Sequence, residues 1–272
     1  MNSPVKRQNP GGTYDPDYFA PLFAIEDRHF WFQGRNPILS AIIRQLTEGM
    51  QPGYRVMEVG CGTGSVLRAL ENACPDGMVY GMDLFREGLE YARKRVLCPL
   101  IQGDIHWPPF GAIYQVIGMF DVLEHLSDDL EVLRDIYRML SPEGALVLTV
   151  PAYQSLWSYF DEASHHVRRY EKEELRARLV EAGFSVEYLS PYMMSIFPLV
   201  WLNRRLTTLW SGYSATDMKR NHELSSKELK ITPVINEVLT WLLSREARSI
   251  LRRKIMPVGT SLIAVARKII PG

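Results

Sequence analysis

Cysteine, surplus charge and long apolar runs are all scarce in this sequence of 272 residues. The three cysteines, Cys61, Cys74 and Cys98, show no CxxC spacing, so the sequence predicts neither a disulfide framework nor a zinc site. Lysine and arginine together number 31, as do aspartate and glutamate, so the formal net charge is zero. A general nucleic-acid-binding protein normally carries a basic surplus, so we expect no nucleic-acid partner.

Transmembrane and secretory signals are missing as well. No uninterrupted apolar stretch reaches the length of about 18 residues that a membrane-spanning helix needs. Residues 1–16 are polar, rich in Pro, Gly and Asn, and lack the apolar centre of a signal peptide, so a mobile tail is expected there. Together with the sparse cysteines, these absences favour the reducing cytoplasm.

Apolar residues, at 46% of the chain, are plentiful enough to bury a sizeable core. Their pattern predicts strands at 55–59, 78–82, 99–102, 115–120, 145–150, 184–189 and 261–266. Helices are predicted between them at 65–73, 86–96, 128–140 and 171–182. Repeated β-α-β units with short connections imply an α/β, Rossmann-like fold, with a mostly parallel sheet covered on both faces.

The flanking segments suggest how the chain is divided. A helix beginning at Pro37 and ending near residue 46 follows an aromatic-rich stretch. After the sixth strand come an apolar segment at 193–209, a polar loop at 211–230 and a helix at 233–243. The expected parts are a tail (1–16), an aromatic lid or helical segment (17–50), the core (51–191), a helical insertion (192–258) and the final strand (259–272).

A glycine-rich turn after the first strand gives the strongest signal for a ligand. The run from Glu58 to Gly64 places glycine at every second position, which lets the backbone turn sharply and a ligand lie against it. The helix that follows offers free N–H groups at its start. Ser65 stands where the dinucleotide pattern needs its third glycine, which argues against NAD or FAD. No lysine follows in the P-loop position either.

Asp83, at the end of the second strand, is the second feature of this kind. A carboxylate at this place can accept hydrogen bonds from both hydroxyls of a ribose. The alternative role is to cap the helix that begins near Arg86. Combined with the glycine turn, the position favours ribose binding.

Four motifs in this order resemble the class I S-adenosylmethionine (SAM)-dependent methyltransferases over roughly residues 50–190. They are E-V-G-C-G-T-G at 58–64, G-M-D at 81–83, G-D-I at 103–105 and F-D-V-L-E-H-L at 120–126. The resemblance implies a seven-stranded sheet with an antiparallel last strand, and SAM as the cofactor. The implied or expected cofactor-binding residues are Arg35, Glu58, Gly60, Cys61, Gly62, Gly64, Asp83, Leu84, Asp104, Ile105, Phe120 and His125.

Within that set, the resemblance implies separate roles for separate parts of SAM. Gly60 and Gly62 would lie at the methionine part, and Asp104 at the adenine amino group with Ile105 beside the ring. Phe120 would lie near the sulfonium. Two further patterns, H-F-W-F-Q-G-R at 29–35 and H-V-R-R-Y at 166–170, resemble a narrower group of type 11/12-like methyltransferases. That narrower match says more about which residues form the site than about which substrate is bound.

The segment 157–170, after the fifth strand, is the best candidate for meeting the methyl acceptor. His166 or His165 could act as a general base, with His166 favoured because it belongs to the family pattern. Arg168 and Arg169 could hold a phosphate or carboxylate of the acceptor. The alternative is that the R-R-Y run packs and caps the next helix. The predicted catalytic residues are His165, His166, Arg168, Arg169 and Tyr170.

An aromatic N-terminal segment could cover the cofactor as a lid, with Arg35 pairing with the methionine carboxylate of SAM. The alternative is an N-terminal helix anchored by Phe30 and Trp31. For His125, a structural role competes with a functional one. Neither pair of neighbouring histidines has a metal-ligand context, so no metal is predicted. The expected substrate-binding residues are His29, Trp31, Tyr153 and Trp157.

The sequence of the helical insertion bears on which acceptor we expect. An apolar run at 192–202 precedes Arg204 and Arg205, and basic residues recur between 245 and 254. This suits a helix at the inner face of a membrane, but a lobe packed over the acceptor site or in a dimer interface is slightly favoured. The sequence leaves the oligomeric state open.

We expect methyl transfer from SAM to a small or lipid-like acceptor, with a lipid headgroup or isoprenoid-type acceptor ahead of a water-soluble metabolite. The apolar insertion and the two arginines motivate that order. The rival functions are a SAM-binding regulatory protein without turnover and an NAD-dependent dehydrogenase.

Overall fold

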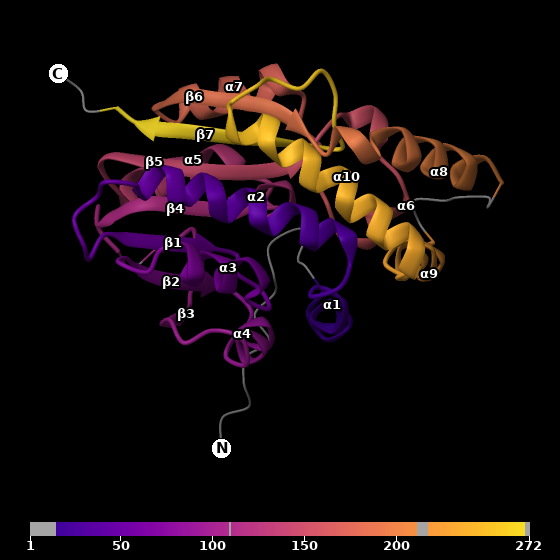
Figure 1. Ribbon diagram of the computed structural model, residues 1–272, viewed down its shortest axis with the longest axis horizontal. Coiled ribbons are helices and arrows are strands. Elements are labelled where there is room, and N and C mark those ends of the chain that lie inside the picture. The colour runs from indigo at the N-terminus through magenta and orange to yellow at the C-terminus, as the bar shows by residue number, and fades with distance from the viewer. Residues whose placement is uncertain (1–14, 109, 211–216, 270–272) are drawn as a thin grey trace.

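A single seven-stranded sheet organises the chain, in the strand order β3-β2-β1-β4-β5-β7-β6 (Figure 1). The computed structural model describes residues 15–108, 110–210 and 217–269, so most of the expected tail lies outside the described residues. The strands are β1 (Arg55–Val59), β2 (Met78–Asp83), β3 (Leu100–Gln102), β4 (Tyr114–Phe120), β5 (Leu140–Pro151), β6 (Phe184–Tyr192) and β7 (Ser261–Lys268). The strands β1 to β5 pair in parallel, whereas β7 runs antiparallel to both β5 and β6. The predicted Rossmann-like sheet with an antiparallel last strand is confirmed.

Helices cover both faces of this sheet. The helices α2, α3 and α10 lie on one face, and α5 and α7 lie on the other (Figure 1). The helices are α1 (Phe19–Ile25), α2 (Phe30–Thr47), α3 (Ser65–Ala73), α4 (Arg86–Ala92), α5 (Asp129–Met139), α6 (Tyr159–Ala163), α7 (Lys172–Glu181), α8 (Phe197–Trp210), α9 (Met218–Glu228) and α10 (Pro233–Leu251). Short 3₁₀ turns are η1 (Pro16–Tyr18), η2 (Leu123–His125), η3 (Gln154–Leu156) and η4 (Met194–Ile196).

The central strands are apolar on both sides because both sides are covered. Alternate residues of β4 point to opposite layers: Val116 packs with α2, α3 and α10, and Ile117 with α5 and α7. Val147 and Leu148 of β5 also point to opposite layers, Val147 with Val116 and Leu148 with Ile117. Each such side chain contributes about 1.5–3 kcal/mol when fully buried. The sheet is therefore a rigid base for whatever lies at its strand ends.

The N-terminal helix differs from its prediction. It was expected to begin at Pro37, but α2 begins at Phe30 and carries Pro37 inside it. His29 caps it, because its Nδ1 accepts a hydrogen bond from the Trp31 N–H at 3.3 Å. The proline removes one helical N–H, yet the buried row that includes Leu39 holds the helix on the sheet. Tertiary packing outweighs the local signal here.

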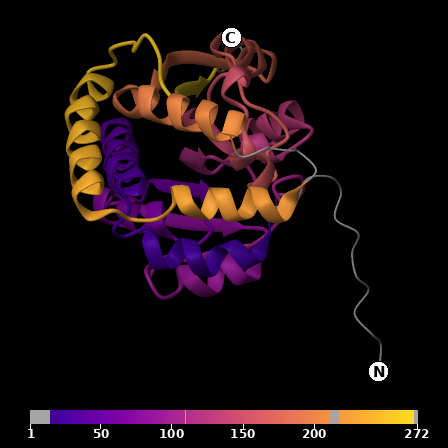
Figure 2. The same ribbon diagram turned by 90° about the vertical axis from the view of Figure 1, so that its right-hand side faces the viewer.

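The insertion between β6 and β7 is helical. α8, α9 and α10 surround the end of the molecule at which the parallel strands terminate (Figures 1 and 2). The predicted polar loop at 211–230 was wrong over 218–228, which form α9; residues 211–216 lie outside the described part of the chain. Asn221 and Ser225 of α9 are buried, and the helix packs on α6. Within the described residues, no helix is long and apolar enough to cross a membrane.

Candidate active site

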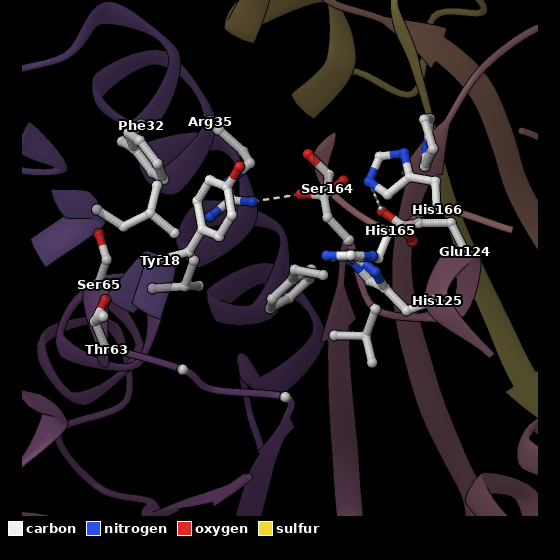
Figure 3. A pocket seen from close by; sticks show the side chains of 18 of the residues that line it. Tyr18, Phe32, Arg35, Thr63, Ser65, Glu124, His125, Ser164, His165 and His166 are labelled. Atoms are coloured by element: carbon white, nitrogen blue, oxygen red, sulfur yellow. Dashed lines mark hydrogen bonds and ion pairs between the residues drawn. The ribbon is translucent and has the colours of Figure 1, made fainter. Parts of the chain in front are cut away.

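A cavity of about 610 Å³ lies at the carboxyl ends of the central strands. Its size is that of a typical small-molecule site. Figure 3 shows the side chains that line it. Those from the N-terminal half of the sheet and from α2 form one wall: Phe32, Arg35, Thr63 and Ser65. Those from the loop after β4 and the segment after α6 form the other: Glu124, His125, Ser164, His165 and His166.

The glycine turn forms the floor beside β1. Gly60, Gly62 and Gly64 all have positive φ, at 73°, 50° and 78°, a conformation that other residues adopt only with strain. Gly60 and Gly62 line the cavity, and so does Cys61, whose thiol has its pKa raised by burial. Gly64 does not line it. A Cβ there would lie 3.0 Å from Ala92 of α4, so this glycine serves helix packing, contrary to its predicted role at the cofactor.

Asp83 closes the turn from the side of β2. Its two carboxylate oxygens accept hydrogen bonds from the N–H groups of Gly62 at 2.7 Å and Phe85 at 2.8 Å. Burial raises the pKa of Asp83 to about 6, although these N–H donors oppose the shift. Each oxygen keeps a second lone pair, so two ribose hydroxyls can still be accepted. Leu84, next in the chain, also lines the cavity.

Glu58 brings a second carboxylate to the same floor. It is buried at the end of β1, and its Oε2 has no hydrogen-bond partner among the described residues. Burial raises the pKa of Glu58 well above its ordinary value, with the positive charge of Arg35 opposing. A buried acceptor without a donor suits a cationic or N–H-bearing ligand, such as the ammonium group of SAM. The residues present therefore fit this cofactor.

Arg35 has a different partner from the predicted one. The sequence hypothesis paired it with the methionine carboxylate of SAM, but in the structure its guanidinium forms an ion pair with Asp121. The group also stacks over the ring of Trp31, with 4.1 Å between Cζ and the ring centroid. Asp121 itself adopts a φ of 56° where the loop after β4 begins. The pair fixes that loop against α2.

Another part of the cavity lies beside β3 and β4, where the resemblance implied the adenine. Asp104, Ile105 and Phe120 line the cavity there, as expected. One Asp104 oxygen, Oδ1, accepts a hydrogen bond from the N–H of His106 at 3.0 Å. His106 lines the cavity as well, and the sequence reasoning gave it no role. Its position three residues after Gly103 in the third motif could have suggested it.

The opposite end holds a histidine oriented by a carboxylate. The Nδ1 of His166 lies 2.9 Å from Oδ1 of Asp161, which is fully buried. Burial alone would raise the pKa of Asp161, but Arg169 and His166 outweigh it and hold the pKa below its ordinary value. The other ring nitrogen, Nε2, lies 4.0 Å from Oε1 of Glu124. A dyad of this kind leaves one imidazole nitrogen available at the cavity.

Two buried groups complete this end. Glu124 has its pKa raised well above the ordinary value by burial and by the nearby charge of Asp121. Burial lowers the pKa of His125 to about 3, and the neighbouring His166 adds to that shift. The rings of His125 and His166 meet edge to face with their centroids 4.9 Å apart. The sequence reasoning gave no role to Glu124 or Asp161, although Glu124 belongs to the motif at 120–126 and Asp161 lies in the segment 157–170.

The predicted anion clamp is not formed. Arg168 lies outside the cavity lining and donates to Oδ2 of Asp129 at 2.9 Å. Tyr170 donates to the same oxygen at 3.0 Å, so both residues anchor the start of α5. Arg169 does line the cavity, but its Nε donates to Asp161 at 2.7 Å. The packing alternative therefore describes the R-R-Y run better than acceptor binding does.

Two of the four expected substrate-binding residues also lie elsewhere. Tyr153 and Trp157 do not line the cavity, and the Trp157 Nε1 donates to Glu162 at 2.8 Å. His29 and Trp31 do line it. Burial lowers the pKa of His29.

Segments far apart in the sequence close the cavity from above. The hydroxyl of Tyr18 in η1 is hydrogen-bonded to the imidazole of His222 in α9, and burial raises the pKa of Tyr18 to about 12. Glu26, after α1, accepts from Thr63 of the glycine turn and pairs with Arg95. The N-terminal segment is thus fastened to the floor on one side and to the insertion on the other. None of these contacts was foreseen from the sequence.

Comparisons with known proteins identify the family of the chain. Residues 28–189, more than half of the chain, match the family model described as Methyltransferase domain. The chain belongs to this family. The predicted resemblance to class I SAM-dependent methyltransferases is confirmed, and SAM is the cofactor that goes with this membership.

Curated relatives of this methyltransferase-domain chain include two groups of O-methyltransferases. The malonyl-[acyl-carrier protein] O-methyltransferase of Legionella pneumophila is 26% identical over 64% of the chain and 65% of its own length. The ubiquinone biosynthesis O-methyltransferase of Pectobacterium atrosepticum is 27% identical over 52% of the chain and 62% of its own length. The matched regions thus span less than two thirds of these relatives.

Solved structures share the fold over nearly the whole chain. A chain from the complex of the Haloferax volcanii Trm112 methyltransferase activator superposes with a TM-score of 0.58 at 18% identity, covering 94% of this chain and 96% of that one. A phosphoethanolamine N-methyltransferase 2 of Haemonchus contortus, in complex with SAM, gives a TM-score of 0.54 at 19% identity, covering 87% and 53%. At these identities the likeness shows the fold alone.

Proposed function

We propose that this chain transfers the methyl group of SAM to an acidic oxygen, a phenol or a carboxyl group, of a largely apolar small molecule. One observation carries the proposal. The His166–Asp161 dyad opens onto the same cavity as the glycine turn and Asp83. A group that can activate an oxygen therefore faces the place where the cofactor fits.

The cofactor-binding roles follow from the floor of the cavity. The backbone at Gly60 and Gly62 lies against the methionine part, and Asp83 accepts the ribose hydroxyls. Glu58 receives the ammonium group, and Asp104 meets the adenine. SAM supplies a methyl group that is already activated on sulfur. The protein has to align the acceptor, exclude water and withdraw a proton.

His166 is the residue we assign to the acceptor oxygen. Asp161 holds its Nδ1, which fixes the ring and leaves Nε2 on the cavity side. A phenol is largely protonated near neutral pH and has to lose its proton as its oxygen attacks, and the imidazole is the ordinary group for that task. A carboxyl group is already ionised at this pH, so the imidazole would only position its oxygen. The names of the O-methyltransferase relatives point the same way.

The walls around this end favour an apolar acceptor. Ile196 of η4 and Val200 of α8 line the cavity together with Leu229 after α9 and Phe160 of α6. Arg204, which lines this side together with Arg169, forms ion pairs with Asp161 at 3.9 Å and Glu228 at 3.5 Å. A lipid-like acceptor with a ring or chain among these side chains fits better than a highly charged metabolite.

We also infer that the outer face of the insertion meets an anionic membrane surface, such as the cytoplasmic leaflet. Val234, Val238 and Trp241 of α10 are exposed on one face, which continues into Arg245 and Arg248. This order of apolar and basic residues is typical of interfacial helices. It would place the cavity close to a source of apolar acceptors.

Turnover with candidate acceptors tests the function. Purified chain is incubated with SAM and phenolic or carboxylic lipids, and S-adenosylhomocysteine is measured. We expect His166→Ala to lower turnover by about 10²–10⁴-fold, the range for loss of an acid–base group, with SAM affinity retained. His165→Asn is the matched control, because asparagine tolerates the positive φ of that position.

Full turnover in His166→Ala would contradict the assignment of that residue. SAM binding without S-adenosylhomocysteine formation from any acceptor would favour the alternative, a SAM-binding regulatory protein. Tight NADH binding without SAM binding would favour a dehydrogenase instead.

A further inference from the structure

Glu124 is a buried carboxylate whose charge is poorly compensated. Its side chain is 1% exposed, and Oε2 has no hydrogen-bond partner in the described part of the chain. Burying a carboxylate is costly unless it is paired, fully hydrogen-bonded or bound to a metal. Arg169, whose positive charge acts on Glu124, already donates to Asp161 and to the backbone oxygen of Ala152. The structure thus leaves a place for a positive charge beside Glu124.

Two imidazoles share that place. One ligand atom each from Glu124, His125 and His166 lie within 4.8 Å of one another. The separation of 4.0 Å between His166 Nε2 and Glu124 Oε1 is too long for a hydrogen bond. It is close to the roughly 3.3 Å between two ligands of a zinc ion whose bonds are about 2.0–2.1 Å long. A modest side-chain adjustment around a shared cation would close the difference.

Both imidazoles are also held from behind. His166 binds Asp161 through Nδ1, so Nε2 is the nitrogen turned toward Glu124. The His125 ring is hydrogen-bonded to the backbone of His165. Metal-binding histidines almost always have their second nitrogen fixed in this way by a carboxylate or a backbone carbonyl.

We propose that Glu124, His125 and His166 together hold one divalent first-row metal ion such as Zn²⁺ at the acceptor end of the cavity. This inference rests on the proposed function and deepens it. Two histidines and one glutamate form a ligand set that such ions accept, and three protein ligands leave a coordination position open. Because Glu124, His125 and His166 all line the cavity, that position faces the acceptor.

The ion would change how the oxygen is activated. A phenol oxygen binds the open position, its pKa falls, and its proton passes to solvent water, whereas a carboxylate oxygen binds there already ionised. The oxygen lone pair then forms the O–CH₃ bond as the S–CH₃ bond of SAM breaks, and S-adenosylhomocysteine is released. His166 acts here as a ligand and Asp161 as its positioning residue, which accounts for the dyad without a free base.

Zinc binding by the full-length chain tests the site. The protein is stripped with a chelator, and Zn²⁺ alone is titrated by calorimetry, with bound metal counted by elemental analysis. We expect one saturable site in the wild type. Glu124→Gln and His166→Gln should each weaken Zn²⁺ affinity by more than about tenfold, and Asp161→Asn by about 10–100-fold. His106→Gln, a cavity histidine outside the cluster, should keep wild-type Zn²⁺ affinity.

Retained SAM binding shows that each variant is folded, so a loss of zinc is read as loss of the site. Absence of saturable Zn²⁺ binding, or equal affinity in all variants, overturns the metal site. Turnover that survives the chelator also overturns it, while leaving methyl transfer by His166 as a base intact. A wild-type chain that binds Zn²⁺ in this way but does not bind SAM would instead overturn the proposed function.

Discussion

At the scale of single residues, burial rather than residue type decides what the acids of this site can do. Glu58, Asp83 and Glu124 all have their pKa raised by burial at strand ends. Asp83 alone among the three receives two backbone N–H groups, so its pKa rises only to about 6. A carboxylate that titrates there can report on cofactor binding.

We predict that SAM affinity falls as the pH drops through about 6. The hydroxyls of bound ribose donate to ionised Asp83, so its pKa in the complex lies below that in the free protein. Protonation therefore favours the free state, and affinity should be highest above pH 6 and decline below it by up to about tenfold per pH unit. Calorimetry between pH 5 and 8 measures this.

Asp83→Asn provides the control for that profile. It should weaken SAM binding by about 1–3 kcal/mol at pH 7, the scale of lost polar contacts in a buried site. It should also remove the decline below pH 6. A wild-type profile that stays flat across this range would rule out ionised Asp83 as the ribose acceptor.

At the scale of elements, the cavity exists because short segments from distant parts of the chain meet above it. η1 reaches α9 through Tyr18 and His222, which are 204 residues apart. On the far side, Glu246 of α10 accepts from the N–H groups of Met194 and Ser195 at 3.0 Å each. The insertion is thus fastened to the N-terminal lid and to its own first turn.

We predict that Tyr18→Phe loosens the lid without unfolding the chain. Loss of one hydrogen bond, worth about 0.5–1.5 kcal/mol, should raise amide hydrogen exchange over 16–25 and weaken SAM binding by less than about tenfold. Tyr137→Phe is the matched control. The Tyr137 hydroxyl donates a hydrogen bond to the backbone oxygen of Ile269, and Tyr137 does not line the cavity. Unchanged exchange over the lid in Tyr18→Phe would show that the contact does not hold it closed.

We predict that Glu246→Ala destabilises the fold. The substitution leaves two backbone N–H groups of η4 without an acceptor, which should lower the free energy of unfolding by about 1–3 kcal/mol in urea titrations. Glu237→Ala, on the exposed face of the same helix, should change it by less than about 0.5 kcal/mol. Equal effects of the two substitutions would mean that Glu246 does not support the turn.

At the scale of the whole molecule, the charges that sum to zero are unevenly distributed along the chain. Residues 197–254 contain eleven lysines or arginines and five acids, a surplus of six positive charges, which the rest of the chain balances. The same segment carries exposed Leu199, Trp201 and Trp241. Basic charge and exposed apolar side chains on one lobe are the features that attract a protein to anionic lipid.

We predict that the chain floats with anionic vesicles and not with neutral ones. Trp241→Glu should reduce flotation several-fold, because it places a negative charge on the proposed contact face. Leu97→Glu is the control, since Leu97 is also an exposed apolar residue, at 99% against 55% for Trp241, but lies outside the insertion. Flotation that is absent, or insensitive to Trp241→Glu, would remove this face as the membrane contact.

The fold and the cofactor end could be predicted from the sequence because their signals are local. The spacing of apolar residues predicted all seven strands. The glycine turn and the carboxylate of Asp83 could likewise be predicted from a few neighbouring residues. Prediction failed where contacts with distant parts of the chain override the preference of the local sequence. Pro37 stands inside α2 because the helix buries an apolar row, and 218–228 form α9, which packs on α6 and has Asn221 and Ser225 buried.

What the sequence by itself determined is thus the Rossmann-like sheet, the glycine turn and the place of Asp83, since short-range periodicity and backbone freedom specify them. Only the tertiary structure decided the acceptor end. It pairs Arg168 with Asp129 and joins Asp161 to the Nδ1 of His166. It also brought Glu124 beside that ring. Such pairings join separate loops, and the burial that gives them their charge state arises only when the chain closes around them.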